Sequence, residues 1–220
     1  MTKIIKLVNS DIESILNVEN NSFIPSIQAN KETILDRLNK GHTYLGATQE
    51  GKLIGAIAFR FAHFSPDFSD FKIRQPTFEE WANEKSDSEG NAIFAYSLGV
   101  IPKYRSGIIS KKLLKKTIEM ACDCKKEFLV GDGRIPSYNG SNENGFENFH
   151  RNEALREAIN KYLKNDVVIP RDILSQDPIV GLYMKLIPEL KILGVTDSKF
   201  IEEDYPAGGH RVIVYVDLQK

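Results

Sequence analysis

The fold is decided by the stretch Ser97-Leu98-Gly99-Val100-Ile101-Pro102-Lys103-Tyr104-Arg105-Ser106-Gly107-Ile108-Ile109-Ser110-Lys111-Lys112-Leu113-Leu114. Its pattern predicts a buried strand, a basic turn and the start of an amphipathic helix in immediate succession. The first amides of a helix have no partner inside the helix, and the helix dipole adds about half a positive charge there. The unit therefore predicts an anion site such as a phosphate would occupy, to which Arg105, Lys111 and Lys112 would add mobile positive charge.

Basic residues are concentrated after this strand. Between Ile101 and Lys126 there are eight Lys or Arg and two acidic residues, although the whole chain has a net charge of -1. A local basic patch in a balanced protein suits a small polyphosphate better than a nucleic acid, which usually requires a broad basic face. An ordinary loop followed by a lysine-rich surface helix is the alternative interpretation.

The pattern Val100-x-Pro102-x-Tyr104-Arg105, followed by a turn and Leu113-Leu114, resembles the coenzyme A signature of the GNAT N-acyltransferases. The resemblance implies an α+β fold with a central mixed, twisted sheet of about seven strands flanked by helices. It also implies transfer of an acetyl group from acetyl-CoA to a primary amine, by direct attack in a ternary complex. In the family, the strand binds the pantetheine arm and the turn wraps the pyrophosphate. The cofactor-binding residues implied here are Leu98, Gly99, Val100, Arg105, Ser106, Gly107, Ile108, Ile109, Ser110 and Lys111.

The turn departs from the family pattern at one position. Ile108 stands where the first glycine of the pattern is expected, and Gly107 comes one residue early. A β-branched Ile resists positive φ, which glycine adopts freely. Either Gly107 makes the close approach to the pyrophosphate or the turn is shifted by one residue.

Hydrophobic periodicity predicts the remaining elements. The turn Glu50-Gly51 indicates a hairpin, and helical spacing recurs over 149–163. We expect helices over 10–21, 31–39, 109–122 and 177–187, and strands over 3–8, 43–49, 52–61, 92–100, 127–131, 190–195 and 211–218.

The length of 220 residues, with 41% hydrophobic residues, predicts one domain. The resemblance implies that it is a GNAT domain over 1–220, with insertions at about 62–91 and 134–170. The turn Gly133-Arg134-Ile135-Pro136 and the carboxyl-terminal pattern resemble the GNAT domains fused to nitrilase-like amidohydrolases. The first insertion holds the only Trp together with four Phe, and one or two helical turns are expected after Thr77. Its aromatic residues either wall an acceptor site or complete the core.

The helix containing Leu182-Tyr183-x-Lys185 matches the closing helix of the family. The resemblance implies that Tyr183 is the general acid that protonates the leaving thiolate, and that the N–H of Leu98 or Val100 binds the oxyanion. A phenol pKa near 10 is close enough to a thiol pKa of about 8.5 for transfer. A core tyrosine is the alternative. The general base stays open among loop carboxylates and ordered water, the carboxylates being Glu79, Glu80, Asp87 and Glu89.

Other site classes find little support in the sequence. The two cysteines, Cys122 and Cys124, have neither zinc nor redox spacing, and the four histidines form no recognisable metal pattern, so no metal is expected. The amino terminus lacks a secretory pattern, and no apolar run approaches the roughly 20 residues that cross a bilayer. We expect a cytoplasmic protein without a membrane or nucleic-acid partner.

A small-molecule amine is favoured over a protein lysine as acceptor, and a homodimer is among the oligomeric states left open. Two alternatives to acetyl transfer remain. One is an acyltransferase that uses a longer acyl-CoA. The other is a regulatory module that binds CoA without turnover.

Overall fold

The computed structural model describes residues 1–69, 76–141 and 149–219. The chain divides into two compact units. The first comprises Met1–Asp70, Glu80–Val130 and Asp217–Lys220, and the second comprises Phe71–Glu79 and Gly131–Val216. That the whole chain is one GNAT domain stays a prediction.

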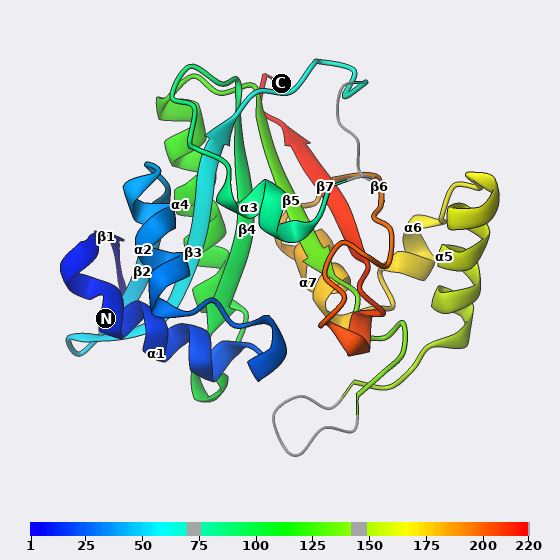
Figure 1. Ribbon diagram of the computed structural model, residues 1–220, viewed down its shortest axis with the longest axis horizontal. Coiled ribbons are helices and arrows are strands. Elements are labelled where there is room, and N and C mark those ends of the chain that lie inside the picture. The colour runs from blue at the N-terminus through cyan, green and yellow to red at the C-terminus, as the bar shows by residue number, and fades with distance from the viewer. Residues whose placement is uncertain (70–75, 142–148, 220) are drawn as a thin grey trace. The chain divides into compact units, whose positions relative to one another are not determined.

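A seven-stranded sheet in the order β1-β2-β3-β4-β5-β7-β6 runs through the chain (Figure 1). Four neighbouring pairs are antiparallel, namely β1–β2, β2–β3, β3–β4 and β6–β7. A helix, α4, connects β4 to its neighbour β5, which is how parallel strands are joined. The expected mixed sheet is therefore confirmed. The strands are β1 (Lys3–Leu7), β2 (Thr43–Gln49), β3 (Lys52–Ala62), β4 (Ala92–Val100), β5 (Phe128–Arg134), β6 (Lys191–Val195) and β7 (Arg211–Asp217).

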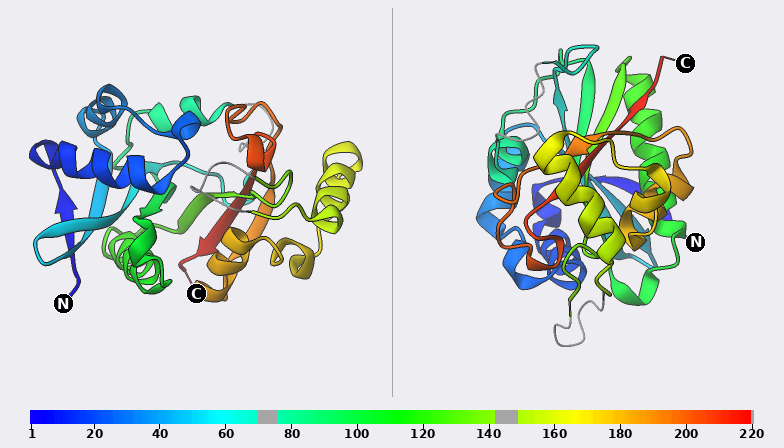
Figure 2. Two further views of the ribbon diagram at one scale, coloured as in Figure 1. Left: turned by 90° about the horizontal axis from the view of Figure 1, so that it is seen from below. Right: turned by 90° about the vertical axis from the view of Figure 1, so that its right-hand side faces the viewer.

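In the first unit, helices cover both faces of the sheet. α1 (Ile12–Ser22) and α2 (Lys31–Asn39) lie on one face and α4 (Ile108–Asp123) on the other (Figure 2). Buried residues recur every three or four positions along α4, as an amphipathic helix requires. They are Ile109, Leu113, Leu114, Thr117 and Ala121. β3 is apolar over almost its whole length because both of its faces are covered.

The hairpin between β2 and β3 is confirmed. Glu50 and Gly51 have φ of 53° and 76°, the conformation of a two-residue turn whose twist matches the flanking strands. Short 3-10 helices complete the connections at Asn9–Asp11, Pro25–Ile27, Pro102–Tyr104 and Tyr205–Ala207.

The aromatic residues of the first insertion are largely buried. The expected helical turns form α3 (Phe78–Asn83). Trp81 lies edge-on to Phe94 with ring centroids 5.5 Å apart, and Phe68 lies 5.1 Å from Phe128. These contacts support the interpretation that the aromatics complete the core. Residues 70–75 of this insertion, and 142–148 of the second, lie outside the described residues.

From β5 onward the structure differs from the expected elements in three places. β5 continues to Arg134, so the expected strand end at Gly131 is wrong. The helix expected from residue 149 is α5 (Glu153–Asn165), which begins where the side chain of Asn152 accepts a hydrogen bond from the N–H of Leu155. A short helix, α6 (Arg171–Leu174), was not expected. α7 (Pro178–Leu186) was expected within 177–187.

Candidate functional site

The turn after β4 presents the open end of α4. Gly107 has φ 77° and ψ -21° and precedes the first helical residue, Ile108. The N–H of Lys111 makes the first hydrogen bond of the helix, to the carbonyl of Gly107 at 3.0 Å. The N–H groups of Gly107, Ile108, Ile109 and Ser110 precede that bond and have no partner within the helix. Gly107 itself therefore takes the positive φ, and Ile108 needs none.

The two isoleucines of this turn point to different surroundings. Ile108 is 58% exposed, whereas Ile109 is buried. The Ile109 side chain lies 3.1 Å from where a Cβ on Gly55 would be, so it packs on β3. Ser106 and Lys111 are exposed, and Ser110 is half-buried. Because a diphosphate needs convergent N–H groups and nearby positive charge, the residues at this turn fit one.

Arg105 does not supply mobile charge to the turn, and that expectation is wrong. Its Nε donates a hydrogen bond to the carbonyl of Val100, and its Nη2 donates one to the carbonyl of Ser22, both at 2.9 Å. The guanidinium thereby ties the end of α1 to the end of β4. Arg105 positions the turn that follows.

β4 is irregular just before Leu98, Gly99 and Val100, the strand residues expected to bind the cofactor. Ser97 pairs with Ala58 and Ala95 pairs with Phe59, so Tyr96 is the extra residue of a β-bulge. A bulge re-aims side chains and often accompanies an active site. Beyond it, Leu98, Gly99 and Val100 pair regularly with Ile57, Ala56 and Gly55 of β3.

Tyr183 lies on α7 in the second unit. The side chain of Asp177 caps this helix by accepting hydrogen bonds from the N–H groups of Ile179 and Val180. The Tyr183 ring lies against Gly133, because a Cβ there would be 3.5 Å from Cε2 of the ring. Burial, followed by the charge of Asp132, raises the pKa of Tyr183 to about 12. The phenol is therefore protonated at neutral pH and can act as a proton donor.

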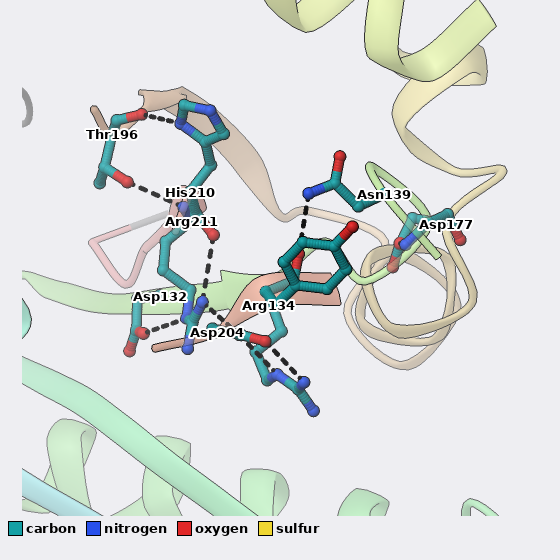
Figure 3. Close-up of polar contacts among 10 residues, drawn as sticks. Asp132, Arg134, Asn139, Asp177, Thr196, Asp204, His210 and Arg211 are labelled. Carbon is teal, nitrogen blue, oxygen red and sulfur yellow. Dashed lines mark hydrogen bonds and ion pairs between the residues drawn. The ribbon is translucent and has the colours of Figure 1, made fainter. Parts of the chain in front are cut away.

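A buried charge network lies in the same unit (Figure 3). Asp204 accepts two hydrogen bonds from Arg134, from Nε and Nη2, both at 2.8 Å. Arg211 lies between two carboxylates, with its Nη1 2.6 Å from Asp204 and its Nε 3.3 Å from Asp132. Burial would raise the pKa of Asp204, but Arg211 and Arg134 together hold it below its usual value. Burial raises the pKa of Asp132 to about 6.

No protein-family model matches the chain. A curated relative, the uncharacterized N-acetyltransferase YkwB of Bacillus subtilis (strain 168), is 29% identical over 127 residues, which make up 57% of this chain and 53% of the relative. The chain spans about half the length of the curated relative it matches.

Solved structures match over nearly the whole chain. The loading GNATL domain of CurA from Lyngbya majuscula has a TM-score of 0.70 at 16% identity, covering 100% of this chain and 98% of that one. The GphF GNAT-like decarboxylase in complex with isobutyryl-CoA has a TM-score of 0.66 at 17% identity, covering 99% and 100%. The PaiA N-acetyltransferase from Thermoplasma acidophilum, in complex with coenzyme A, has a TM-score of 0.53 at 14% identity, covering 99% of each chain.

The chain has the GNAT fold. Its expected likeness to the nitrilase-fused GNAT domains stays a prediction.

Within this GNAT fold, the four loop carboxylates that were considered as general bases lie at the protein surface. Glu79, Glu80, Asp87 and Glu89 are all exposed. Asp87 caps its own turn by accepting a hydrogen bond from the N–H of Glu89 at 3.1 Å.

Reasoning from the sequence missed the network of Asp132, Asp204 and Arg211. Asp132 was expected just after the strand over 127–131, and Asp204 lies in a segment without periodicity. A charged residue inside a predicted strand, as Arg211 is, offered the one available signal.

Among the described residues, no group of three or more His, Cys, Asp or Glu could hold a metal ion. The helices described here are also too short or too polar to cross a membrane.

Proposed function

We propose that this protein is an acyl-CoA-dependent N-acetyltransferase that transfers an acetyl group to a primary amine by direct attack in a ternary complex. The observation that carries the proposal is Gly107 in the left-handed conformation at the start of α4, directly after the bulged strand β4. The name of the curated relative and the CoA-bound neighbours with the same fold support it. We propose a small-molecule acceptor and a cytoplasmic location.

In the proposed reaction, CoA supplies the acetyl group as an activated thioester. The N–H groups of Gly107, Ile108, Ile109 and Ser110 bind the diphosphate, and Lys111 adds charge next to them. The backbone of Leu98, Gly99 and Val100 lies along the pantetheine arm, with the N–H of Leu98 or Val100 facing the developing oxyanion.

Tyr183 donates a proton to the leaving thiolate. Since its pKa is about 12 and that of a thiol is about 8.5, complete transfer from Tyr183 to a free thiolate would be uphill. The transfer is therefore concerted with cleavage of the C–S bond, when the sulfur gains its charge.

A second function is supported by the two structural neighbours with TM-scores of 0.70 and 0.66, one of which is named a GNAT-like decarboxylase. In that case the protein would act on an acyl-CoA whose acyl group carries a carboxylate and would release CO2. The same CoA site would serve both functions.

The test is release of CoA thiol by the purified protein. Acetyl-CoA and isobutyryl-CoA are each offered with a panel of small primary amines and a lysine-containing peptide, and the acylated products are identified by mass spectrometry. We expect acetyl-CoA with a small amine to give the fastest release. A preference for isobutyryl-CoA would indicate a longer acyl donor, and CO2 release from a carboxylated acyl-CoA alone would favour the second function.

Two variants test whether CoA binds at the start of α4. Lys111→Ala is expected to raise the KM for acetyl-CoA, whereas Lys115→Ala, about 6 Å farther along the helix axis, is expected to leave it unchanged. Binding of CoA without thiol release from any amine would overturn the proposed transferase and leave a CoA-binding module.

A further inference from the structure

A cluster of polar side chains in the first unit has no role in the CoA site described above. It consists of Glu19 on α1, Arg37 on α2, His42 before β2, Tyr44 on β2 and Tyr96 at the bulge of β4. Arg37, His42, Tyr44 and Tyr96 are buried, and Glu19 is half-buried. Burying polar groups costs stability unless they are hydrogen-bonded, so the partners of each group decide what the cluster can do.

Tyr96 and His42 hold each other in fixed positions. His42 Nε2 lies 2.7 Å from the carbonyl oxygen of Glu84, and its Nδ1 lies 2.8 Å from the hydroxyl of Tyr96. A carbonyl accepts only, so Nε2 carries the proton and Nδ1 accepts from Tyr96. Both ring nitrogens are occupied, and burial lowers the pKa of His42 to about 4. His42 is therefore an orienting group and not a base.

Arg37 is committed to neighbours other than Glu19. Its Nε donates to Oδ1 of Asn83 at 2.9 Å, and its guanidinium carbon lies 5.0 Å from the centre of the Tyr96 ring. Among the described residues, Glu19 makes no ion pair within 4.0 Å. Its Oε1 accepts one hydrogen bond, from the N–H of Ala29 at 2.9 Å. A half-buried carboxylate with one amide partner keeps capacity for a further donor.

Glu19 faces the same strand as the proposed thioester site. Ser22 follows it by three residues on α1, and residues with this spacing lie on one face of a helix. The Ser22 Cβ lies 2.9 Å from where a Cβ on Gly99 would be, so this face of α1 rests on β4. The charge of Glu19 also raises the pKa values of Tyr44 and Tyr96, after the larger effects of burial and their other neighbours.

We propose that Glu19 binds the amine acceptor as an ammonium ion and takes a proton from it, in a cluster with Tyr44 and Tyr96 on β2 and β4. This role rests on the proposed acetyl transfer. The ammonium gives one proton to the Glu19 carboxylate. The neutral nitrogen then forms a bond to the acetyl carbon, the C–S bond breaks, and the nitrogen loses its second proton to water as the amide forms; where Tyr183 protonates the sulfur, water returns a proton to Tyr183. The sulfur leaves with a proton from Tyr183 or solvent, and Glu19 releases its proton to water.

The electrostatics of the cluster agree with this role. Burial raises the pKa of Glu19 from 4.5 to about 7, against lowering by the Ala29 hydrogen bond and the Arg37 charge. A base with a pKa near the working pH combines a sizeable ionised fraction with a useful proton affinity. The groups that face it and carry or could carry charge are Arg37 from α2, Tyr44 from β2 and Tyr96 from β4.

The test compares Glu19→Gln with Glu13→Gln on the same helix. Glu13 is exposed and pairs with Lys31 at 2.6 Å, so its variant removes a carboxylate without touching the cluster. We expect Glu19→Gln to lower kcat/KM for the amine by a hundredfold or more and to remove the acidic limb of its pH profile. The affinity for CoA, measured by calorimetry, should be unchanged in both variants.

The outcomes separate two failures. If the wild type acetylates an amine and Glu19→Gln does so as fast as Glu13→Gln, the role of Glu19 is overturned and the transferase stands. If the wild type acetylates no amine in the panel, the transferase and the role of Glu19 fail together. A circular dichroism spectrum matching the wild type shows that the Gln variant is folded, and a Glu19→Gln protein that has lost CoA affinity would also contradict the proposal.

Discussion

Each of the two compact units of this chain holds a carboxylate that folding desolvates, fully buried for Asp204 and half-buried for Glu19. The two carboxylates are stabilised in opposite ways. Asp204 in the second unit is bonded by two guanidinium groups, Arg134 and Arg211. Glu19 in the first unit has one backbone N–H and a neighbouring arginine that bonds elsewhere. The pKa of Asp204 is accordingly lowered, while that of Glu19 is raised to about 7.

The number of cationic partners therefore distinguishes a carboxylate that stabilises the fold from one that can exchange a proton during a reaction. A carboxylate with two cationic partners stays ionised and cannot accept a proton at neutral pH. A carboxylate that is desolvated without a direct ion pair exchanges protons near pH 7. Burial alone does not make this distinction, because both side chains are removed from water.

The largest expected effect is that of Asp204→Asn. Removing this charge leaves Arg134 and Arg211 buried without their shared partner, which typically costs about 3–5 kcal/mol. Urea denaturation at pH 7 measures the loss in the free energy of unfolding. A loss no larger than that of a surface ion pair would contradict the structural role of Asp204.

Glu19→Gln is expected to change stability in the opposite direction. The folded-state pKa of about 7 lies above the unfolded value of 4.5, so the neutral form is favoured in the folded state. The resulting stability is complete below pH 4.5 and is lost as the pH rises through 7. The Gln variant should match the wild type at pH 4.5 and exceed it at pH 8 by about 1–2 kcal/mol, a figure reduced for partial solvent exposure. Equal differences at both pH values would show that Glu19 is not desolvated.

Much of the first unit could be predicted from the sequence, because its elements carry strong local signals. Turn residues bound β2 and β3, and the apolar spacing of α4 continues for four turns. The turn between β4 and α4, which is proposed to bind CoA, was the exception. Its departure from the glycine pattern at Ile108 left two alternatives, and the left-handed φ of Gly107 supports the one in which Gly107 makes the close approach.

The second unit was harder to predict because long-range pairs shape it. Arg134, the last residue of β5, bonds Asp204, which lies 70 residues later in the chain. Glu19 was missed for a similar reason. On a helix, a lone Glu next to polar neighbours is typical of a solvated face, and nothing local shows that β2 and β4 pack against it.

Asp132→Asn is expected to lower the pKa of Tyr183, because the charge of Asp132 raises it. This decrease in the pKa should be smaller than the increase that burial causes, because burial is the larger of the two effects. A ¹³C-labelled tyrosine titration by NMR measures it. A pKa that stays at about 12 in the variant would show that burial alone accounts for the shift.

The smallest expected effect is that of Asp36→Asn. Asp36 lies on α2, and Lys40 follows one turn later at the end of that helix. The two form an exposed ion pair, with Lys40 Nζ 2.7 Å from Asp36 Oδ2. Such pairs contribute about 0.3–0.5 kcal/mol. The variant serves as the surface reference for Asp204→Asn in the same urea denaturation, and a loss above about 1 kcal/mol would weaken the contrast between buried and exposed pairs.

The most direct test of the account is a calorimetric titration of CoA into the wild type, Gly107→Ala and Gly51→Ala. The two glycines have nearly the same φ, 77° and 76°, so alanine strains both turns alike, but only Gly107 precedes the N–H groups proposed to bind the diphosphate. We expect the wild type and Gly51→Ala to bind CoA with equal affinity and Gly107→Ala to bind it at least tenfold more weakly. No binding by the wild type, or equal affinity in all three proteins, would contradict the CoA site.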